Sequence, residues 1–192
     1  SETILNITLK KGGVPASLPQ HTGVEILPQH IFKGPESTPF LAPRGVFLRD
    51  NQLFVSDTGR NRVFIWNRFP KTDFQEPDIV LGQGDADGAG RNAGGMVNAA
   101  TLQYPSGIWS DGQRLIVADA WNHRVLIWHS MPTRHGQAAD VVIGQRDFDS
   151  NQPNAHKVGA DPSDRSLFWP YGVFSDGQRL WIADTGNRRI LY

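Results

Sequence analysis

The apolar residues of this chain occur in short runs that are separated by Asp, Asn, Gly and Pro. In the middle of the chain, "GIWSD" is followed by the turn "DGQ" at 111–113, then by "RLIVAD" and "RVLIWHS", and after a loop by "DVVIGQ" at 140–145. Short runs rich in β-branched and aromatic residues are typical of strands, and Asp-Gly is typical of a tight hairpin. No stretch of convincing length has helical periodicity. The pattern therefore predicts an all-β protein.

The same four-strand pattern occurs three times in register. The turn Pro-x-Gly begins at Pro43, Pro105 and Pro170, so the repeats are 62 and 65 residues apart. An Asp follows each Pro by 14 positions and an Arg follows each Asp by five; these residues are Asp57, Asp119 and Asp184, and Arg62, Arg124 and Arg189. Four antiparallel strands per repeat predict the blades of a β-propeller. The blades are expected at about residues 43–83, 105–145 and 170–192.

The repeats resemble those of the NHL family. Blades of that family carry "PxGV…dg.lyVaDtgNnRv..w", and this chain has "PSGIWSDGQRLIVADAWNHRVLIW" and "PYGVFSDGQRLWIADTGNRRILY". The resemblance covers 43–192 and is strongest to long-repeat bacterial members, in which each blade ends "vlGQ.df" and runs into a long loop. It implies a six-bladed propeller. Known members bind proteins or RNA, and one is a lyase, so the resemblance leaves the function open.

The sequence before the first blade contains one more strand pattern. "EILPQH" at 25–30 matches the fourth strands at 78–83 and 140–145, whereas 1–24 has no clear repeat and is assigned as an N-terminal extension. The propeller segment 25–192 then contains one isolated fourth strand, two complete blades of four strands and a last blade of three strands. Together these twelve strands equal half of a six-bladed ring. Propellers need about four to eight blades. We therefore expect self-association, as a two-fold dimer, or a second chain that closes the ring; the alternative is that the chain is part of a longer or cleaved protein.

The composition narrows the classes of partner. Lys plus Arg is 19 and Asp plus Glu is 19, so the net charge is zero. Broad binding to nucleic acid or to anionic lipid needs a basic excess, so we expect neither a membrane nor nucleic acid as partner. The chain has no Cys, which excludes disulfides, zinc–thiolate sites and thiol catalysis. No apolar run reaches the roughly 18 residues of a membrane helix. A soluble protein is expected, with a lean toward the cytoplasm.

One end of the propeller is the place where we expect binding. In a four-stranded meander the turns alternate between two ends, so the turn between the second and third strands shares an end with the loop that leads to the next blade. The two long loops span 84–104 and 146–169. Loops of that length are usually functional or mobile, and functional residues gather on loops.

The middle blade departs from the repeat at this end. Trp121 stands where the other blades have Gly, and His123 stands where they have Asn or Arg188. Trp is frequent at binding hot spots; the alternative is that the long loops of the chain itself cover it. The candidate ligand-binding residues are Trp121, His123, Arg60 and Arg188. The two Arg residues make an anionic partner an open possibility.

Other polar patterns favour structural roles. The Asp and Arg that recur in every blade are expected to bond to their own turn and to tie strand to strand. The two long loops share Asp-x-Asp, but they lack the third acidic ligand and the closing Glu of an EF-hand, so no cofactor is expected and calcium is the alternative; the residues are Asp85, Asp87, Asp147 and Asp149. The histidines fall at unrelated repeat positions and do not match the zinc ligands of the family's lyase.

The sequence therefore favours a non-enzymatic scaffold whose loops bind a protein or another ligand. Two alternatives stay open. A metal-dependent lyase or hydrolase would have its site at the central channel, formed by converging His or carboxylate groups. An RNA-binding protein would need a contiguous basic patch on the same end of the propeller.

Overall fold

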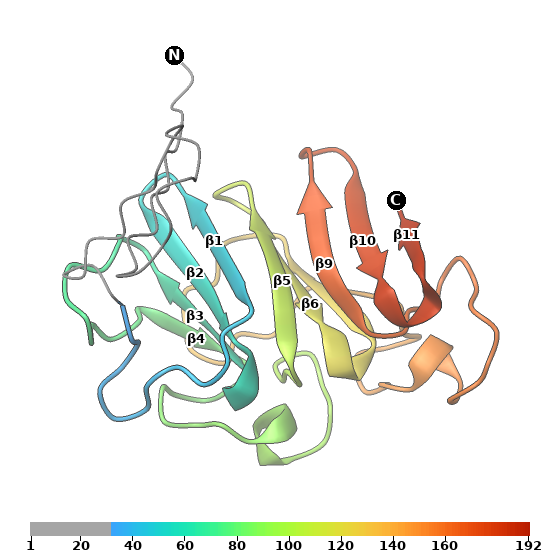
Figure 1. Ribbon diagram of the computed structural model, residues 1–192, viewed down its shortest axis with the longest axis horizontal. Coiled ribbons are helices and arrows are strands. Elements are labelled where there is room, and N and C mark those ends of the chain that lie inside the picture. Colours follow the sequence, from blue (N-terminus) through green and yellow to red (C-terminus); the bar gives the residue numbers. More distant parts are fainter. Residues whose placement is uncertain (1–31) are drawn as a thin grey trace, which may run out of the picture.

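The computed structural model describes residues 32–192, and its strands form three antiparallel sheets (Figure 1). The first sheet contains β1 (Gly45–Arg49), β2 (Gln52–Asp57), β3 (Arg62–Trp66) and β4 (Ile79–Leu81). The second contains β5 (Pro105–Ser110), β6 (Leu115–Asp119), β7 (Arg124–Trp128) and β8 (Val141–Ile143). The third contains β9 (Pro170–Ser175), β10 (Leu180–Asp184) and β11 (Arg189–Leu191). Each sheet is one blade, and the expected all-β propeller architecture is confirmed.

In the second and third blades the hairpins between the first and second strands follow from Asp-Gly turns, whereas the first blade turns at Asp50-Asn51 with Asp50 at φ 51°. In the second blade Gly112 has φ 90°, which glycine adopts without steric cost. The carboxylate of Asp111 accepts hydrogen bonds from the backbone N–H of Gln113 at 3.0 Å and of Arg114 at 2.6 Å. The equivalent bonds in the third blade lower the pKa of Asp176 to about 2. The hairpin that "DGQ" predicts is therefore confirmed.

The core consists of the surfaces at which neighbouring blades meet. Side chains of a strand point alternately to the two sides of the sheet, so Ile108 packs toward the first blade and the next residue, Trp109, packs toward the third. Both are 7% exposed. At the equivalent positions of the outer blades, Val46 is 73% exposed and Phe174 is 59% exposed. The first and third blades therefore each expose one apolar side of their sheet. In the middle blade both sides are covered by a neighbouring blade.

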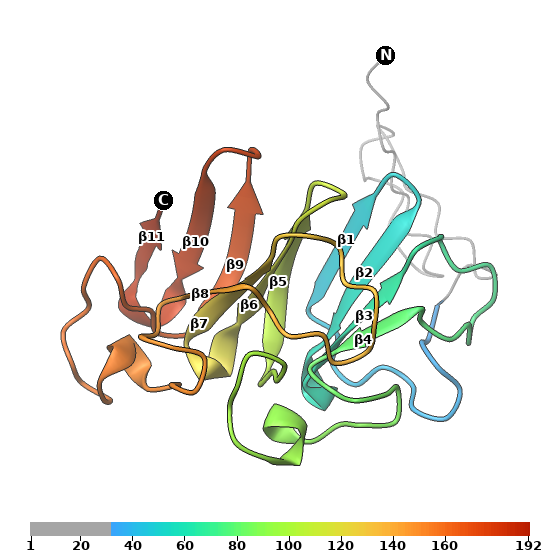
Figure 2. The same ribbon diagram turned by 180° about the vertical axis from the view of Figure 1, so that it is seen from behind.

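The two ends of the blades carry different connections (Figures 1 and 2). The hairpins β1–β2, β5–β6 and β9–β10 lie at one end. The opposite end, which we call the loop face, carries the 3₁₀ turns Thr58–Arg60, Ala120–Asn122 and Thr185–Asn187 together with the long loops 84–104 and 146–169. This is the predicted alternation. The predicted strand at 25–30 and the extension 1–24 lie outside the described residues.

Helices contribute little to this fold. Within residues 32–192 every helical segment is a short 3₁₀ turn. In that part of the chain no helix has the length and apolar character needed to cross a bilayer.

Candidate functional site

The repeated Asp anchors the connection that enters each blade. In the second blade one carboxylate oxygen of Asp119 accepts the backbone N–H of Gln103 at 2.7 Å, and the other accepts Nε of Arg124 at 2.8 Å. Asp119 and Arg124 are both fully buried. Burial raises the pKa of Asp119, and Arg124 opposes that shift. The ion pair therefore fixes the incoming chain against the turn that follows β6.

The repeated Arg then binds the loops on either side. The guanidinium of Arg124 donates to the carbonyl oxygens of Asn98 and Thr101, both at 2.9 Å, and of Phe148 at 2.7 Å. In the first blade Arg62 donates to Thr38 and Ala86 in the same way. The structural interpretation of these residues therefore holds in the described chain, with one addition. The ion pair ties Asp119 at the end of β6 to Arg124 at the start of β7, as expected, and the other donors of Arg124 also crosslink the two long loops.

Two Asn pairs attach the long loops to the 3₁₀ turns. The side-chain amides of Asn92 and Asn122 exchange hydrogen bonds at 3.2 and 2.8 Å. Asn154 and Asn187 exchange the equivalent bonds at 3.1 and 2.7 Å. Asn92 and Asn154 have positive φ, which Asn tolerates better than most residues. The shared pattern of the two loops thus reflects how each loop is attached to the blade that follows it.

The residue before each Pro-x-Gly turn has an unusual backbone conformation. Tyr104 has φ 57° and Trp169 has φ 51°. Positive φ is costly for bulky residues and persists where neighbours fix it. The preceding residue is held on both sides, because the N–H of Gln103 bonds to Asp119 and its carbonyl oxygen accepts the N–H of Trp121 at 3.1 Å. This arrangement directs one large aromatic ring from each of the two connections toward the loop face.

Tyr104 and Trp121 form the centre of an aromatic and basic cluster. Their rings stack with centroids 4.5 Å apart and planes 20° apart. The Arg44 guanidinium lies over the Tyr104 ring at 5.0 Å, and that of Arg91 lies over the Trp121 ring at 5.8 Å. The indole N–H of Trp121 donates to the hydroxyl of Tyr171 at 3.1 Å. We call these five residues the loop-face cluster; it joins all three blades and the loop 84–104.

Trp121 occupies a position that disfavours a side chain. At the equivalent Gly59 and Gly186, an added Cβ would lie 2.5 and 2.6 Å from the carbonyl oxygens of Leu41 and Phe168. The N–H of those glycines bonds to the same carbonyls at 2.8 and 2.7 Å, whereas the bond from Trp121 is 3.1 Å. The turn of the second blade is therefore slightly opened to admit the indole. Trp121 remains 37% exposed, because Tyr104 and Arg91 cover it only in part.

His123 lies beneath the surface and not on it. Its side chain is 6% exposed, and its Nδ1 accepts the backbone N–H of Trp169 at 3.2 Å. Burial lowers the pKa of His123 to about 4, although Asp184 opposes the shift. In the first blade Asn61 has the same role, since its Oδ1 accepts the N–H of Tyr104 at 3.0 Å. His123 is therefore a neutral, buried hydrogen-bond acceptor, and its ring is not among the exposed groups of the loop face.

The two Arg candidates differ in their surroundings. Arg60 is half-buried and its Nε donates to the carbonyl oxygen of Pro39 at 3.1 Å. Arg188 is exposed at the C-terminal end of the 3₁₀ turn Thr185–Asn187, with φ 55°. Both lie on the loop face with Trp121. Their role in binding a ligand remains a prediction.

The acidic pairs of the long loops bond to their own turns. Asp85 Oδ1 accepts the backbone N–H of Asp87 and of Gly88 at 3.0 and 2.9 Å. Asp147 Oδ1 accepts the N–H of Asp149 at 3.1 Å and the hydroxyl of Ser150 at 2.6 Å. Within residues 32–192 no three His, Asp or Glu side chains are grouped as metal ligands. Whether calcium binds here stays a prediction.

Sequence reasoning identified Trp121 but not most of its neighbours. Arg44, Arg91 and Tyr171 belong to the cluster, and Trp169, which is 42% exposed, lies next to His123. One signal was available, because Tyr104 and Trp169 both stand directly before a repeated Pro. Their positive φ, the stacking of Tyr104 on Trp121 and the contact of Trp169 with His123 could not be read from that signal.

Comparison with known proteins supports the repeat assignment. No family model matches the chain. The chain is 30% identical over 125 residues to NHL repeat-containing protein 2 of Bos taurus, and 27% identical over 170 residues to NHL repeat-containing protein 2 of Gallus gallus. These matches cover 60% and 81% of this chain but 14% and 21% of the relatives, so the chain spans only a minor part of their length. The likeness to bacterial members remains a prediction. The three in-register repeats, the blades that they form and these two relatives make the chain similar to the NHL-repeat β-propeller proteins.

Proposed function

We propose that this segment is a non-enzymatic interaction module whose loop face binds a partner protein through the loop-face cluster. One observation carries the proposal. Trp121 replaces a glycine at a position where a Cβ crowds a backbone carbonyl, and its ring nevertheless stays partly exposed. A residue that violates the local packing rule without being buried is expected at a functional site. Exposed Trp, Tyr and Arg in one cluster also match the composition of binding hot spots.

The cluster suits a rigid recognition surface. Its residues come from three blades and one loop, and the loop is fixed by the Asn92–Asn122 pair and by Arg124. Binding loses less conformational entropy when the surface is already ordered. The repeated Asp and Arg residues already form hydrogen bonds within the chain. The residue at the repeat position of Gly59, Trp121 and Gly186, by contrast, differs between blades.

Selection from a displayed library of random peptides tests this proposal. We expect selected peptides to bind the wild-type chain and to lose affinity for Trp121→Ala by tenfold or more, since removal of a hot-spot Trp costs about 2 kcal/mol or more. Gln113→Ala and Gln178→Ala are matched controls, because both side chains are exposed on hairpins at the opposite end. Peptides whose affinity depends on the hairpin variants and not on Trp121 would contradict the proposal.

We also propose that the apolar sides of the outer blades pack against blades of a second chain. The support comes from the equivalent positions of the three repeats. Phe47, Trp109 and Phe174 share one repeat position, and the first two pack against a following blade. Val46, Ile108 and Val173 share the adjacent position on the other side of the sheet. If the exposed side of the third blade in one chain packs against the exposed side of the first blade in another chain, the contact repeats the packing that occurs twice between neighbouring blades within this chain.

A further inference from the structure

We propose that the loop-face cluster recognises an acidic, extended peptide segment of the partner protein. This inference rests on the proposed function, because it names the chemistry of the partner that the loop face would bind. Three observations support it. The segments around the loop-face cluster are basic, two Arg side chains have unused N–H donors, and the same two side chains lie over the aromatic rings.

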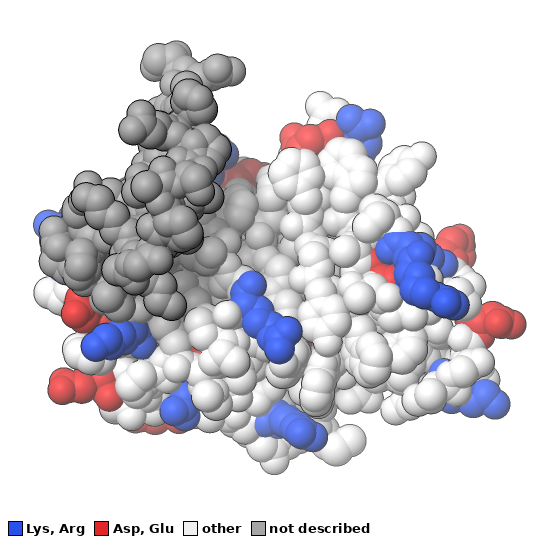
Figure 3. Space-filling model, viewed as in Figure 1, with Lys and Arg blue, Asp and Glu red and all other residues white. Residues whose placement is uncertain are grey.

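The charge of these segments has one sign. The segments 41–44, 58–61, 88–94, 103–106, 120–123, 168–172 and 185–188 contain four Arg and no Asp or Glu. The remaining parts of the two long loops carry six Asp against two Arg and one Lys, so the basic excess is confined to the segments around the loop-face cluster. Figure 3 shows basic side chains projecting from the lower half of the view, which carries the loop face, with most acidic side chains nearer its margins. In a chain of zero net charge, a local excess of this kind favours contact with carboxylates and disfavours basic segments.

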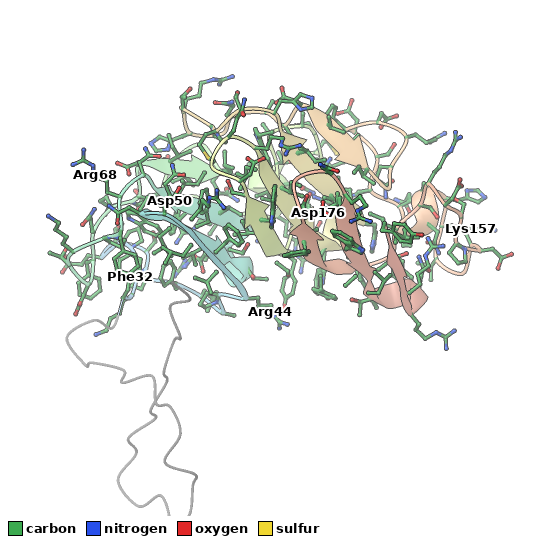
Figure 4. The ribbon with its side chains drawn as sticks, turned by 90° about the horizontal axis from the view of Figure 1, so that it is seen from above. Phe32, Arg44, Asp50, Arg68, Lys157 and Asp176 are labelled. Atoms are coloured by element: carbon green, nitrogen blue, oxygen red, sulfur yellow. The ribbon has the colours of Figure 1, made fainter. Side chains whose placement is uncertain are left out.

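Two of the four Arg side chains, those of Arg44 and Arg91, combine unused N–H donors with contact to the aromatic rings. Arg44 and Arg91 are exposed and rest on the rings of Tyr104 and Trp121. Among the described residues neither guanidinium has a hydrogen-bond acceptor or an acidic partner within bonding distance. Figure 4 shows Arg44 at the margin of the blades. The N–H groups of a guanidinium that point away from the ring remain free to form paired bonds with a carboxylate.

The same stacking argues against a nucleic acid. Proteins that bind single strands leave an aromatic face open, on which a base can stack. Here the inner faces of Tyr104 and Trp121 cover each other, and Arg44 and Arg91 lie over the two rings. The pair therefore offers ring edges and guanidinium N–H groups. Ring edges suit Pro or aliphatic side chains, and the N–H groups suit carboxylates spaced along an extended peptide.

The test measures fluorescence anisotropy of three labelled probes with the complete chain at about 0.15 M salt, where the Debye length is about 8 Å. The first probe is a peptide of about ten residues in which Asp and Glu alternate with Pro and Leu, and which spans roughly 33 Å when extended. The second is the same peptide with Asn and Gln in place of Asp and Glu. The third is a single-stranded oligothymidylate of similar length.

We expect the acidic peptide to bind at least about tenfold more tightly than its amide counterpart, as two charge-assisted Arg contacts would give. The double variant R44A/R91A should lose about tenfold in affinity. The double variant R68A/R134A is the matched control and should bind like wild type, because both residues are exposed and lie on the connections between third and fourth strands, at the other end of the blades. Figure 4 shows Arg68 far from Arg44. Unchanged thermal melting of both double variants keeps the comparison valid.

Equal affinity for the acidic and amide peptides would overturn this inference, and so would equal affinity of R44A/R91A and wild type. Tighter binding of the oligothymidylate that is lost in R44A/R91A would overturn it in favour of nucleic acid. Library peptides that depend on Trp121 but lack Asp and Glu would leave the interaction module standing and refute only its acidic partner. Library peptides that ignore Trp121 would refute the interaction module itself.

Discussion

His123 makes the stability of this protein depend on pH in a direction that the structure fixes. Its Nδ1 accepts the N–H of Trp169, so the ring must be neutral for the bond to exist. Burial lowers its pKa from 6.5 to about 4. In the unfolded chain the ring takes up a proton as the pH falls below 6.5, whereas in the folded chain it does so only near pH 4. The unfolded state therefore binds more protons in that interval, and stability falls as the pH falls.

The magnitude follows from the two pKa values. One pKa unit corresponds to about 1.4 kcal/mol, so the whole interval from 6.5 to about 4 is worth about 3 kcal/mol. Between pH 7.5 and pH 5 the expected loss is about 2 kcal/mol. For a domain of this size that loss lowers the melting temperature by about 4–8 °C.

The variant His123→Asn isolates this contribution. Asn61 occupies the equivalent position in the first blade with φ 55° and accepts the equivalent N–H bond from Tyr104. The substitution should therefore keep the backbone conformation and the bond while removing the titrating ring. We expect wild type to lose about 2 kcal/mol more than His123→Asn between pH 7.5 and pH 5, measured by urea unfolding followed by tryptophan fluorescence. All other titrating groups are common to both proteins and cancel in the difference. Parallel pH profiles of the two proteins would refute the assignment.

Three further predictions test other parts of the structure. Arg124→Ala should lower the free energy of unfolding by about 3–5 kcal/mol, because it leaves Asp119 buried and unpaired, and Arg189→Ala should cost less since its side chain is 25% exposed; equal losses in urea melts would contradict this. Millimolar calcium should leave the melting temperature unchanged, because the carboxylate of Asp147 already caps its own turn; a rise that Asp147→Asn abolishes would show the reverse. Sedimentation should give a mass above that of one chain, which Phe174→Arg reduces to one chain; a monomeric wild type would exclude self-association.

Much of the blade was predictable from the sequence, because its determinants are local. The Asp111–Gln113 hairpin needs only an Asp-Gly turn between two apolar runs. The Asp–Arg pair five residues apart spans a single turn, so its spacing in three copies fixed its position. The side of the sheet that Ile108 and Trp109 face follows from strand alternation. The structure confirms these features, whereas the predicted strand at 25–30 lies outside the described residues.

The loop-face cluster was less predictable, because it depends on contacts between distant segments. The burial of His123 is decided by the connection at Trp169, which lies 46 residues later in the chain. The partial cover over Trp121 comes from Tyr104 and Arg91, and the position of Tyr104 depends on a left-handed conformation that Tyr seldom adopts. Residue type and spacing along the chain do not specify such contacts.

The three turns of the loop face show why departures from a repeat are informative in this protein. Each turn uses the same backbone bonds to hold the chain that enters its blade, so a substitution that preserves those bonds is free to alter what the turn presents. His123 replaces Asn61 and keeps the bond. Trp121 replaces Gly59 and keeps its bond only at a longer distance, 3.1 against 2.8 Å. The first change is hidden beneath the surface, where His123 is 6% exposed. The second is partly exposed and gains no full burial to offset its local cost, which is the physical reason to seek the binding site at Trp121.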